Sequence, residues 1–250
     1  MKTVRRLSII SCFIALLSCK TINLTESHKA YPNQIIDSGL IAEPAYVKEI
    51  TPYKKQLDSI MKQPLSYAKE DFTKEGFSSN EGNLLADLVL DFSKKYAKEK
   101  NIPAPEFCLL NIGGVRTIIP KGTVTVGNMF EVSPFENALV FVSLDGSQIE
   151  ELVDYLNKEK KGHPLAGIKI TYKKDQPHSI EIEGVPFDPN KKYQVVTIDY
   201  LMNGGDKMIF FAKSKDAVVT GLRLRDVLIE QMKQYKVLPD SKDERLIFEN

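Results

Sequence analysis

The sequence predicts one mixed α/β domain that extends from about residue 43 to residue 250. Apolar residues recur at helical spacing in two segments before residue 100. Short β-branched runs bounded by turn residues follow between residues 107 and 198, and helical patterns recur at 147–158 and 223–235. Because the sequence has no repeat of 20–50 residues and no low-complexity block, we expect a single folded body.

The first helix is expected to begin at Thr51. Thr51 suits the N-cap and Pro52 suits the first turn, where a missing backbone N–H costs nothing. The apolar residues that follow share one helical face: Tyr53, Leu57, Ile60 and Met61. The spacing therefore predicts an amphipathic helix here.

A second helix is expected from about Asn80. Asn80 is a suitable cap, and Glu81 would lie near the positive end of the helix dipole. Its apolar stripe is wide: Leu84, Leu85, Leu88, Val89, Phe92 and Tyr96. A stripe of this width predicts that the helix is buried.

Strands are predicted after this helix from short β-branched and aromatic runs. The predicted strands are 107–112, 117–125, 137–144, 168–172, 180–183 and 193–198. The sequences Asp175-Gln176-Pro177 and Asp188-Pro189-Asn190 predict two hairpin turns between them.

The composition limits the function classes. The chain has 250 residues, of which 42% are hydrophobic and 27% charged, values typical of globular domains and not of disordered or fibrous chains. The formal net charge is +1, so there is no basic excess of the kind that binds nucleic-acid polymers. We therefore expect no nucleic-acid partner.

The N-terminus is typical of a secretory signal peptide. Lys2, Arg5 and Arg6 precede an apolar run from Leu7 to Leu17, which is too short to cross a bilayer. We expect residues 1–18 to be removed, which takes away three basic side chains and leaves a mildly acidic mature chain.

The end of this run, Leu16-Leu17-Ser18-Cys19, resembles the lipobox of bacterial lipoproteins. We expect lipidation at Cys19 and a membrane lipoprotein of the bacterial cell envelope, periplasmic or surface-facing. Residues 19–42 are polar and lack a helical or strand period, so they are expected to form a flexible tether. The alternative is a signal peptide that merely contains cysteines.

One cysteine remains for the folded body. Cys108 lies in the apolar run Phe107–Leu110, with no local base or cation to activate its thiol. We expect a core residue, and no intramolecular disulfide is possible once Cys12 is removed and Cys19 is lipidated.

Metal-dependent chemistry has no support in the sequence. The three histidines, His28, His163 and His178, are far apart, and none belongs to a metal-ligand or hydrolase motif. We interpret all three as solvated loop residues. No catalytic residue and no metal ligand is therefore predicted in this chain.

Three loops carry residues suited to a ligand site. Asn111-Ile112-Gly113-Gly114-Val115-Arg116 follows a predicted strand, and its glycines allow close backbone approach while Arg116 offers a planar cationic fork. Ser133–Asn137 places the ring of Phe135 just before a strand, and Tyr200–Asp206 runs into a Gly-Gly turn that carries a carboxylate. Taken singly, each loop is explained as a turn or a core residue.

Together the loops contain the side chains that a nucleoside needs. Two aromatic rings can sandwich a base, an amide can read its edge, and a carboxylate can accept from ribose hydroxyls. The combination predicts a nucleoside or nucleotide site.

The order of these motifs resembles the C-terminal domain of the 5′-nucleotidase family. The matching segments are Gly82–Asp87, Asn111–Arg116, Pro134–Asn137, the Gly146 turn and Tyr200–Asp206. The resemblance covers residues 50–236, nearly the whole mature chain. It implies a layered α/β/β/α domain that gives the family its substrate specificity, in a hydrolase family of nucleotide catabolism.

The resemblance also implies roles for individual residues. Phe135 matches the first ring that stacks on the base, and Tyr200 matches the second, where many members carry Phe. Asn137 matches the residue that contacts the base, and Asp206 the carboxylate that holds the ribose. Two further matches complete the predicted site: Arg116, near the ribose and phosphate, and Gly162, a backbone contact to the base.

The sequence departs from the family in two respects. It has no counterpart of the N-terminal metallophosphatase domain, which supplies both metal ions and the catalytic His/Asp pair. We therefore expect the chain to be inactive alone and divalent metal ions to bind only to a partner. Two arginines upstream of Gly82 in several members are also absent, and only Lys74 could substitute for them, as a weaker point charge.

Two functions follow from this resemblance. The first is the specificity subunit of a split 5′-nucleotidase, with a separately encoded metallophosphatase chain as partner. The second is a non-catalytic nucleoside- or nucleotide-binding lipoprotein. A purely structural lipoprotein is disfavoured, because a scaffold needs neither Asn137 nor Asp206 at these positions.

Overall fold

The computed structural model describes residues 33, 35–37 and 39–249. The chain divides into two compact units, residues 1–48 and residues 49–250. The predicted signal peptide, Cys19 and most of the tether lie outside the described residues. Among the described residues, the helices are all too short or too polar to cross a membrane.

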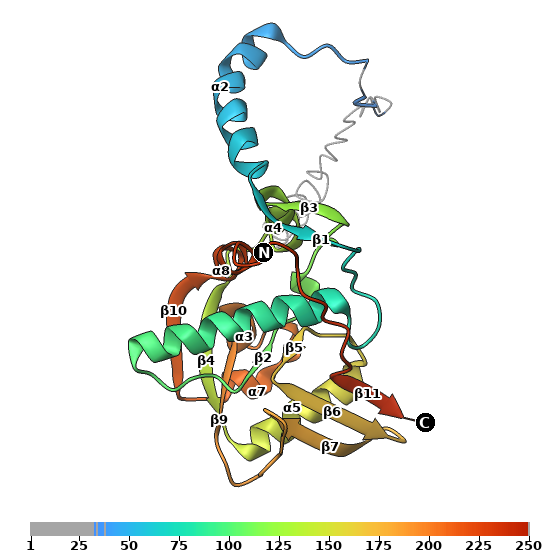
Figure 1. Cartoon of the computed structure of the whole chain (residues 1–250), viewed down its shortest axis with the longest axis vertical. Helices are drawn as coiled ribbons and strands as arrows, with labels where there is room; N and C mark the ends of the chain where they lie inside the picture. Colours follow the sequence, from blue (N-terminus) through green and yellow to red (C-terminus); the bar gives the residue numbers. More distant parts are fainter. Residues whose placement is uncertain (1–32, 34, 38, 250) are drawn as a thin grey trace, which may run out of the picture. The chain divides into compact units, whose positions relative to one another are not determined.

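Helices and strands are interspersed along residues 44–249 (Figure 1). The helices are α2 (Pro44–Met61), α3 (Asn80–Lys100), α4 (Val126–Val132), α5 (Gly146–Glu159), α6 (Asp199–Met202), α7 (Ile209–Ala212) and α8 (Leu224–Met232). The strands are β1 (Pro64–Ala68), β2 (Phe107–Leu109), β3 (Gly122–Thr125), β4 (Ala138–Leu144), β5 (Leu165–Ala166), β6 (Ile168–Lys173), β7 (Gln176–Ile182), β8 (Val185–Pro186), β9 (Tyr193–Ile198), β10 (Ala217–Arg223) and β11 (Leu246–Glu249).

The largest sheet has five strands in the order β10-β4-β9-β2-β5. Strand β9 is central: it is antiparallel to β4, with Leu139 opposite Ile198, and parallel to β2, with Cys108 opposite Val196. The start of β4 and the ends of β9 and β2 therefore lie at one edge of the sheet.

A four-stranded sheet has the order β11-β6-β7-β8, and β1 pairs with β3 in a separate ribbon. The predicted turn at Asp175 does join a hairpin, between β6 and β7. The two residues of the hairpin loop are Lys174 and Asp175, and both have positive φ. Gln176 and Pro177, which were predicted in the turn, are the first two residues of β7. The turn at 188–190 joins β8 to β9, which lie in different sheets, so the prediction of a hairpin there was wrong.

The core is built from apolar side chains on both sides of the large sheet. Helix α3 contacts β2, β5, β9 and α8, and α5 contacts β4 of this sheet and β7 of the smaller one. Four residues of the predicted stripe of α3 are buried, and Phe92 and Tyr96 are partly buried against the core. Cys108 is fully buried, and burial raises the pKa of its thiol, which confirms the prediction of a core residue.

The predicted start of α3 at Asn80 is confirmed, whereas the predicted start of α2 at Thr51 is wrong. Helix α2 begins at Pro44, because its apolar face continues back through Ile50 to Tyr46. Thr51 is therefore not its N-cap, and Pro52 lies inside the helix.

Helix α3 is capped by Ser79, whose Oγ accepts from Gly82 N at 3.1 Å. The predicted cap, Asn80, instead accepts from Thr73 N at 2.8 Å and so ties the preceding loop to the helix. Either polar side chain could have capped the helix, but it is Ser79 that has the extended backbone of a cap.

Several strand predictions were too long. The strand predicted at 107–112 ends at Leu109, because a 3₁₀ turn forms at Ile112–Gly114. Of the stretch predicted at 117–125, only Gly122–Thr125 is strand, with an isolated bridge between Phe72 and Ile119. The elements that were not predicted are β1, β5, β8, β10, β11, α4, α6 and α7.

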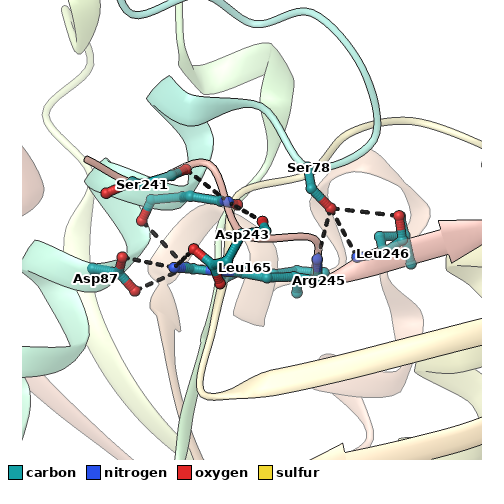
Figure 2. Close-up of polar contacts among 8 residues, drawn as sticks. Ser78, Asp87, Leu165, Ser241, Asp243, Arg245 and Leu246 are labelled. Carbon is teal, nitrogen blue, oxygen red and sulfur yellow. Dashed lines mark hydrogen bonds and ion pairs between the residues drawn. The ribbon is translucent and has the colours of Figure 1, made fainter.

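Arg245 joins the segment before β11 to helix α3 (Figure 2). Its guanidinium donates to both carboxylate oxygens of Asp87, at 2.8 and 2.7 Å, and to Asp243 at 2.7 and 2.9 Å. Asn83 Nδ2 donates to the carbonyls of Ser241 and Asp243 at 3.0 and 2.8 Å. Two residues of the Gly82–Asp87 motif thus hold a distant segment of the chain; we call this network the Arg245 clamp.

Ser78 completes the clamp from the other side (Figure 2). Its Oγ accepts from the backbone N–H groups of Arg245 and Leu246 at 2.8 and 2.9 Å. These bonds fix the start of β11, which pairs in parallel with β6.

Replacing Arg245 by Met should lower the free energy of unfolding by about 2 kcal/mol, because the partly buried carboxylate of Asp87 and the exposed carboxylate of Asp243 lose a charge-assisted partner. Urea unfolding measures this loss. Lys54→Met, which breaks the exposed Lys54–Asp58 pair, is the control and should change stability by less than about 0.5 kcal/mol. Equal stability of Arg245→Met and wild type would contradict the role assigned to the clamp.

Glu81 is a buried acid in the first turn of α3. Its side chain is fully buried, and neither carboxylate oxygen has a hydrogen-bond partner among the described residues. Burial raises the pKa of Glu81 to about 8, although Lys74 acts in the opposite direction. At neutral pH the folded state therefore holds this carboxyl mainly in its neutral form.

This raised pKa makes stability fall with rising pH. Between the ordinary pKa of 4.5 and about 8, the folded state retains a proton that the unfolded state has lost, so the stabilisation declines across that window and levels off above it. Glu81→Gln should flatten this decline, so that its stability relative to wild type is greater at about pH 9 than at about pH 5, measured by urea unfolding. A parallel pH profile for variant and wild type would contradict the assignment.

Candidate functional site

The three strand ends at one edge of the large sheet form the wall of a cavity. β2 leads to Asn111, β9 leads to Tyr200, and β4 is preceded by Phe135 and Asn137. The cavity has a volume of about 270 Å³ and is lined by Asn111, Gly113, Gly114, Phe135, Asn137, Tyr200 and Asp206. All three loops singled out in the sequence thus meet at one place.

Two aromatic side chains in this lining are partly open to solvent. Phe135 and Tyr200 are each 45% exposed, which is unusual for rings that could have been packed in the core. Gly205 makes room for Tyr200, because a Cβ atom there would lie 2.6 Å from two atoms of its ring. The Gly204-Gly205 turn therefore both reverses the chain and leaves room for the Tyr200 ring.

Asp206 is the most connected residue of the cavity. Its Oδ2 accepts from Asn111 Nδ2 at 2.7 Å, and its Oδ1 accepts from the Tyr200 hydroxyl at 2.9 Å. The Tyr155 hydroxyl donates to its backbone carbonyl at 2.9 Å. These contacts hold Asp206 in a left-handed conformation, φ 50°, and fix the direction of the carboxylate.

Asn111 reaches Asp206 because Gly114, in the turn that follows, has no side chain. A Cβ atom on Gly114 would lie 2.9 Å from Asn111 Oδ1, so a larger residue would displace the amide. Asn111 is largely buried, and sequence reasoning named it only as the start of a motif. Its position directly after β2 was the signal that could have identified it as a site residue.

Arg116 lies outside the lining of the cavity. Its side chain is exposed, and Nη1 donates to the carbonyl of Gly113 at 3.3 Å, on the same turn that lines the site. Lys74 Nζ lies nearby and donates to the carbonyls of Val115 and Arg116 at 3.1 and 3.5 Å. Two cationic side chains therefore gather beside the Gly-Gly turn.

Gly162 is also outside the lining. A Cβ atom there would lie 2.2 Å from the carbonyl oxygen of Gly76, so close backbone packing already requires glycine at this position. Its contact with a base remains a prediction.

His163 is buried, which corrects the interpretation of this residue as a solvated loop residue. Only 3% of it is exposed, and its Nδ1 accepts from Ile112 N at 3.3 Å, which supports the turn that carries Gly113. Burial lowers the pKa of His163 to about 4, although Asp206 acts in the opposite direction. The ring is therefore neutral at pH 7 with its proton on Nε2. His178, in β7, is exposed.

A second cavity of about 410 Å³ adjoins the first and shares Gly113 and Asp206 with it. Its other lining residues are Ile112, Tyr155, Glu159, Lys161, His163 and Lys207. Lys161 is paired with Glu159 at 2.8 Å, so the charges of this lining are largely balanced.

The described part of the chain contains no group of three or more His, Cys, Asp or Glu side chains that could hold a metal ion. The lining of the first cavity is suited to binding a ligand. It contains two aromatic rings, the Asn137 amide and the carboxylate of Asp206, which can accept further hydrogen bonds beyond the two it already accepts. Such a set suits a planar ring that carries hydroxyl groups.

Comparison with known proteins agrees with this geometry. The family model described as "5′-nucleotidase, C-terminal domain" matches residues 63–213. The protein UshA of Yersinia enterocolitica is 26% identical over 208 residues, which cover 80% of this chain and 36% of that protein. The 5′-nucleotidase of Rattus norvegicus is 25% identical over 249 residues, which cover 88% of this chain and 43% of that one.

Among solved structures, the 5′-nucleotidase precursor from Thermus thermophilus is similar, with a TM-score of 0.70 and 26% identity. The match covers 83% of this chain and 44% of that one. The chain thus spans less than half the length of each of these relatives. The mixed α/β fold expected from the sequence is that of the C-terminal domain.

The His163 ring should stay neutral to far lower pH than a solvated imidazole, because the cost of burying the charged ring exceeds the attraction of Asp206. A pH titration followed by NMR of labelled histidine should give a midpoint near 4 for His163. His163→Gln identifies the resonance. A midpoint near the ordinary value of 6.5 would show that the ring is solvated after all.

Proposed function

The chain belongs to the family of 5′-nucleotidase C-terminal domains, as its motifs suggested, and on that premise we propose that it binds nucleosides and nucleotides as the specificity subunit of a split 5′-nucleotidase. In this proposal a separately encoded metallophosphatase chain hydrolyses the phosphate ester. The divalent metal ions belong to that partner.

The observation that carries the binding proposal is the meeting of two half-exposed rings, an amide and a held carboxylate around one cavity. A base would lie between Phe135 and Tyr200, because stacking on an aromatic face suits any base. Asn137 would donate to and accept from its edge, and Asp206 would accept from a ribose hydroxyl.

The phosphate would lie towards Arg116 and Lys74. Both cations are fixed to the Gly113–Arg116 turn by bonds to its carbonyls, so they are placed beside the cavity rather than within it. Arg116 offers the fork that pairs with phosphate oxygens, and Lys74 adds a point charge.

The proposal of a separate catalytic chain rests on the family match, which is to a C-terminal domain over residues 63–213. We further propose that the chain is held at the membrane of the cell envelope by lipid on Cys19, which would keep the binding site close to the surface where the partner works.

Calorimetric titration of the chain with adenosine, AMP and UMP in EDTA tests the binding proposal. Phosphate release is then assayed after Mn²⁺ is restored, with and without the candidate metallophosphatase. Binding together with release only in the presence of the partner supports the split enzyme. Binding with no release under either condition supports the alternative of a non-catalytic binder, and no binding would contradict both.

Phe135→Ala should weaken adenosine binding by roughly 1–3 kcal/mol, because one stacking face is lost. The comparison is made by calorimetry, with Tyr53→Ala as the control, an exposed aromatic on α2 that lies outside the cavity. The control should bind as wild type does. Equal affinities of Phe135→Ala and wild type would rule out stacking on this ring.

A further inference from the structure

Phe135 lies in a short loop that contains no helix or strand. Residues 133–137 connect the end of α4 to the start of β4, and Phe135 is half exposed at the cavity. A ring on such a loop needs an external support if it is to present a fixed stacking face.

Arg225 supplies contacts on both sides of Phe135. This arginine lies in the first turn of α8 and is only 4% exposed. Its Nη1 donates to the carbonyls of Ser133 and Pro134 at 3.2 and 3.1 Å, and its Nη2 pairs with the carboxylate of Glu136. The residues before and after the ring are therefore bound by one side chain.

The guanidinium is itself held in place. It lies over the ring of Phe130, 4.1 Å from the ring centroid, which is a cation–π contact away from bulk water. Leu224 N, one residue before, donates to the carbonyl of Asn137 at 2.8 Å. Helix α8 therefore anchors both predicted base-contacting residues, Phe135 and Asn137, without lining the cavity.

We propose that Arg225 is a positioning residue that fixes the Phe135 ring, and with it the stacking face offered to the base. The ligand part of this proposal rests on the proposed function. Pairing with Arg225, and next with Arg223, holds the pKa of Glu136 below its usual range, so the carboxylate is ionised at neutral pH and the contact is charge-assisted.

Arginine is required here by geometry. The three acceptors on this short loop are reached by a planar fork with five donors, whereas a lysine ammonium is a single point that can approach one of them well. Arg223 provides a matched control: its Nε lies 2.9 Å from Glu136 Oε2, but its side chain is 56% exposed. Among the described residues, Arg223 pairs with Glu136 and not with the carbonyls of the loop.

The chain contains no tryptophan, so Phe135→Trp gives a unique fluorescent reporter at the position of the ring. In this background, Arg225→Met and Arg225→Lys should lower the fluorescence anisotropy of the reporter indole and increase its quenching by acrylamide. Arg223→Met should leave both signals unchanged. Far-UV circular dichroism of each variant verifies that the fold is retained.

In the chain with Phe135, Arg225→Met should weaken adenosine binding about tenfold, within the range set by loss of a stacking face. In a Phe135→Ala background the same substitution should cost nothing further, because Arg225 acts through that ring. A purely structural role would instead give equal losses in both backgrounds, and that result would overturn the proposal.

The two proposals fail in different ways. If wild type binds no nucleoside but Arg225→Met still lowers the fluorescence anisotropy of the reporter indole, the positioning role stands and the proposed ligand is wrong. If adenosine binds and the indole is equally immobile with and without Arg225, the positioning role is wrong. If Arg225→Met unfolds, Arg225→Lys, which retains the charge, decides between these outcomes.

Discussion

The pairing of β9 with β4 on one side and with β2 on the other is the constraint on which the site depends. An antiparallel and a parallel partner on the same strand place one strand start and two strand ends at one sheet edge. Asn111, Asn137 and Tyr200 come together for that reason, although they lie far apart in the sequence. The pairing register of these three strands brings the three residues to the same end of the sheet.

The sequence predicted the apolar parts of the fold well, because periodicity reports burial directly. Strand β9 and the buried stripe of α3 follow from local pattern alone. Phe135, Asn137, Tyr200 and Asp206, among the predicted binding residues, line one cavity, because their loops directly precede or follow strands of the large sheet. Chain position relative to a strand was thus the informative signal for these residues.

What could not be predicted depends on partners that are distant in the sequence. His163 was interpreted as a loop residue, but its ring is buried, lies against Tyr155 and accepts a hydrogen bond from Ile112 N. Arg225 looked like one more charged residue on a helix, because its acceptors lie about 90 residues earlier. Helix α2 was predicted too short because Thr51 and Pro52 looked like a helix start, although the apolar face continues back to Tyr46.

The Arg245 clamp also limits the order in which the chain can fold. Asp87 and Arg245 are 158 positions apart, and β6 obtains its parallel partner from the same late segment. A ribosome that has made helix α3 and the large sheet has therefore not yet made the residue that neutralises Asp87. Contacts of such long sequence separation close slowly and late. The four-stranded sheet and the contact between Asp87 and Arg245 are thus expected to close only when the last residues of the chain have been made.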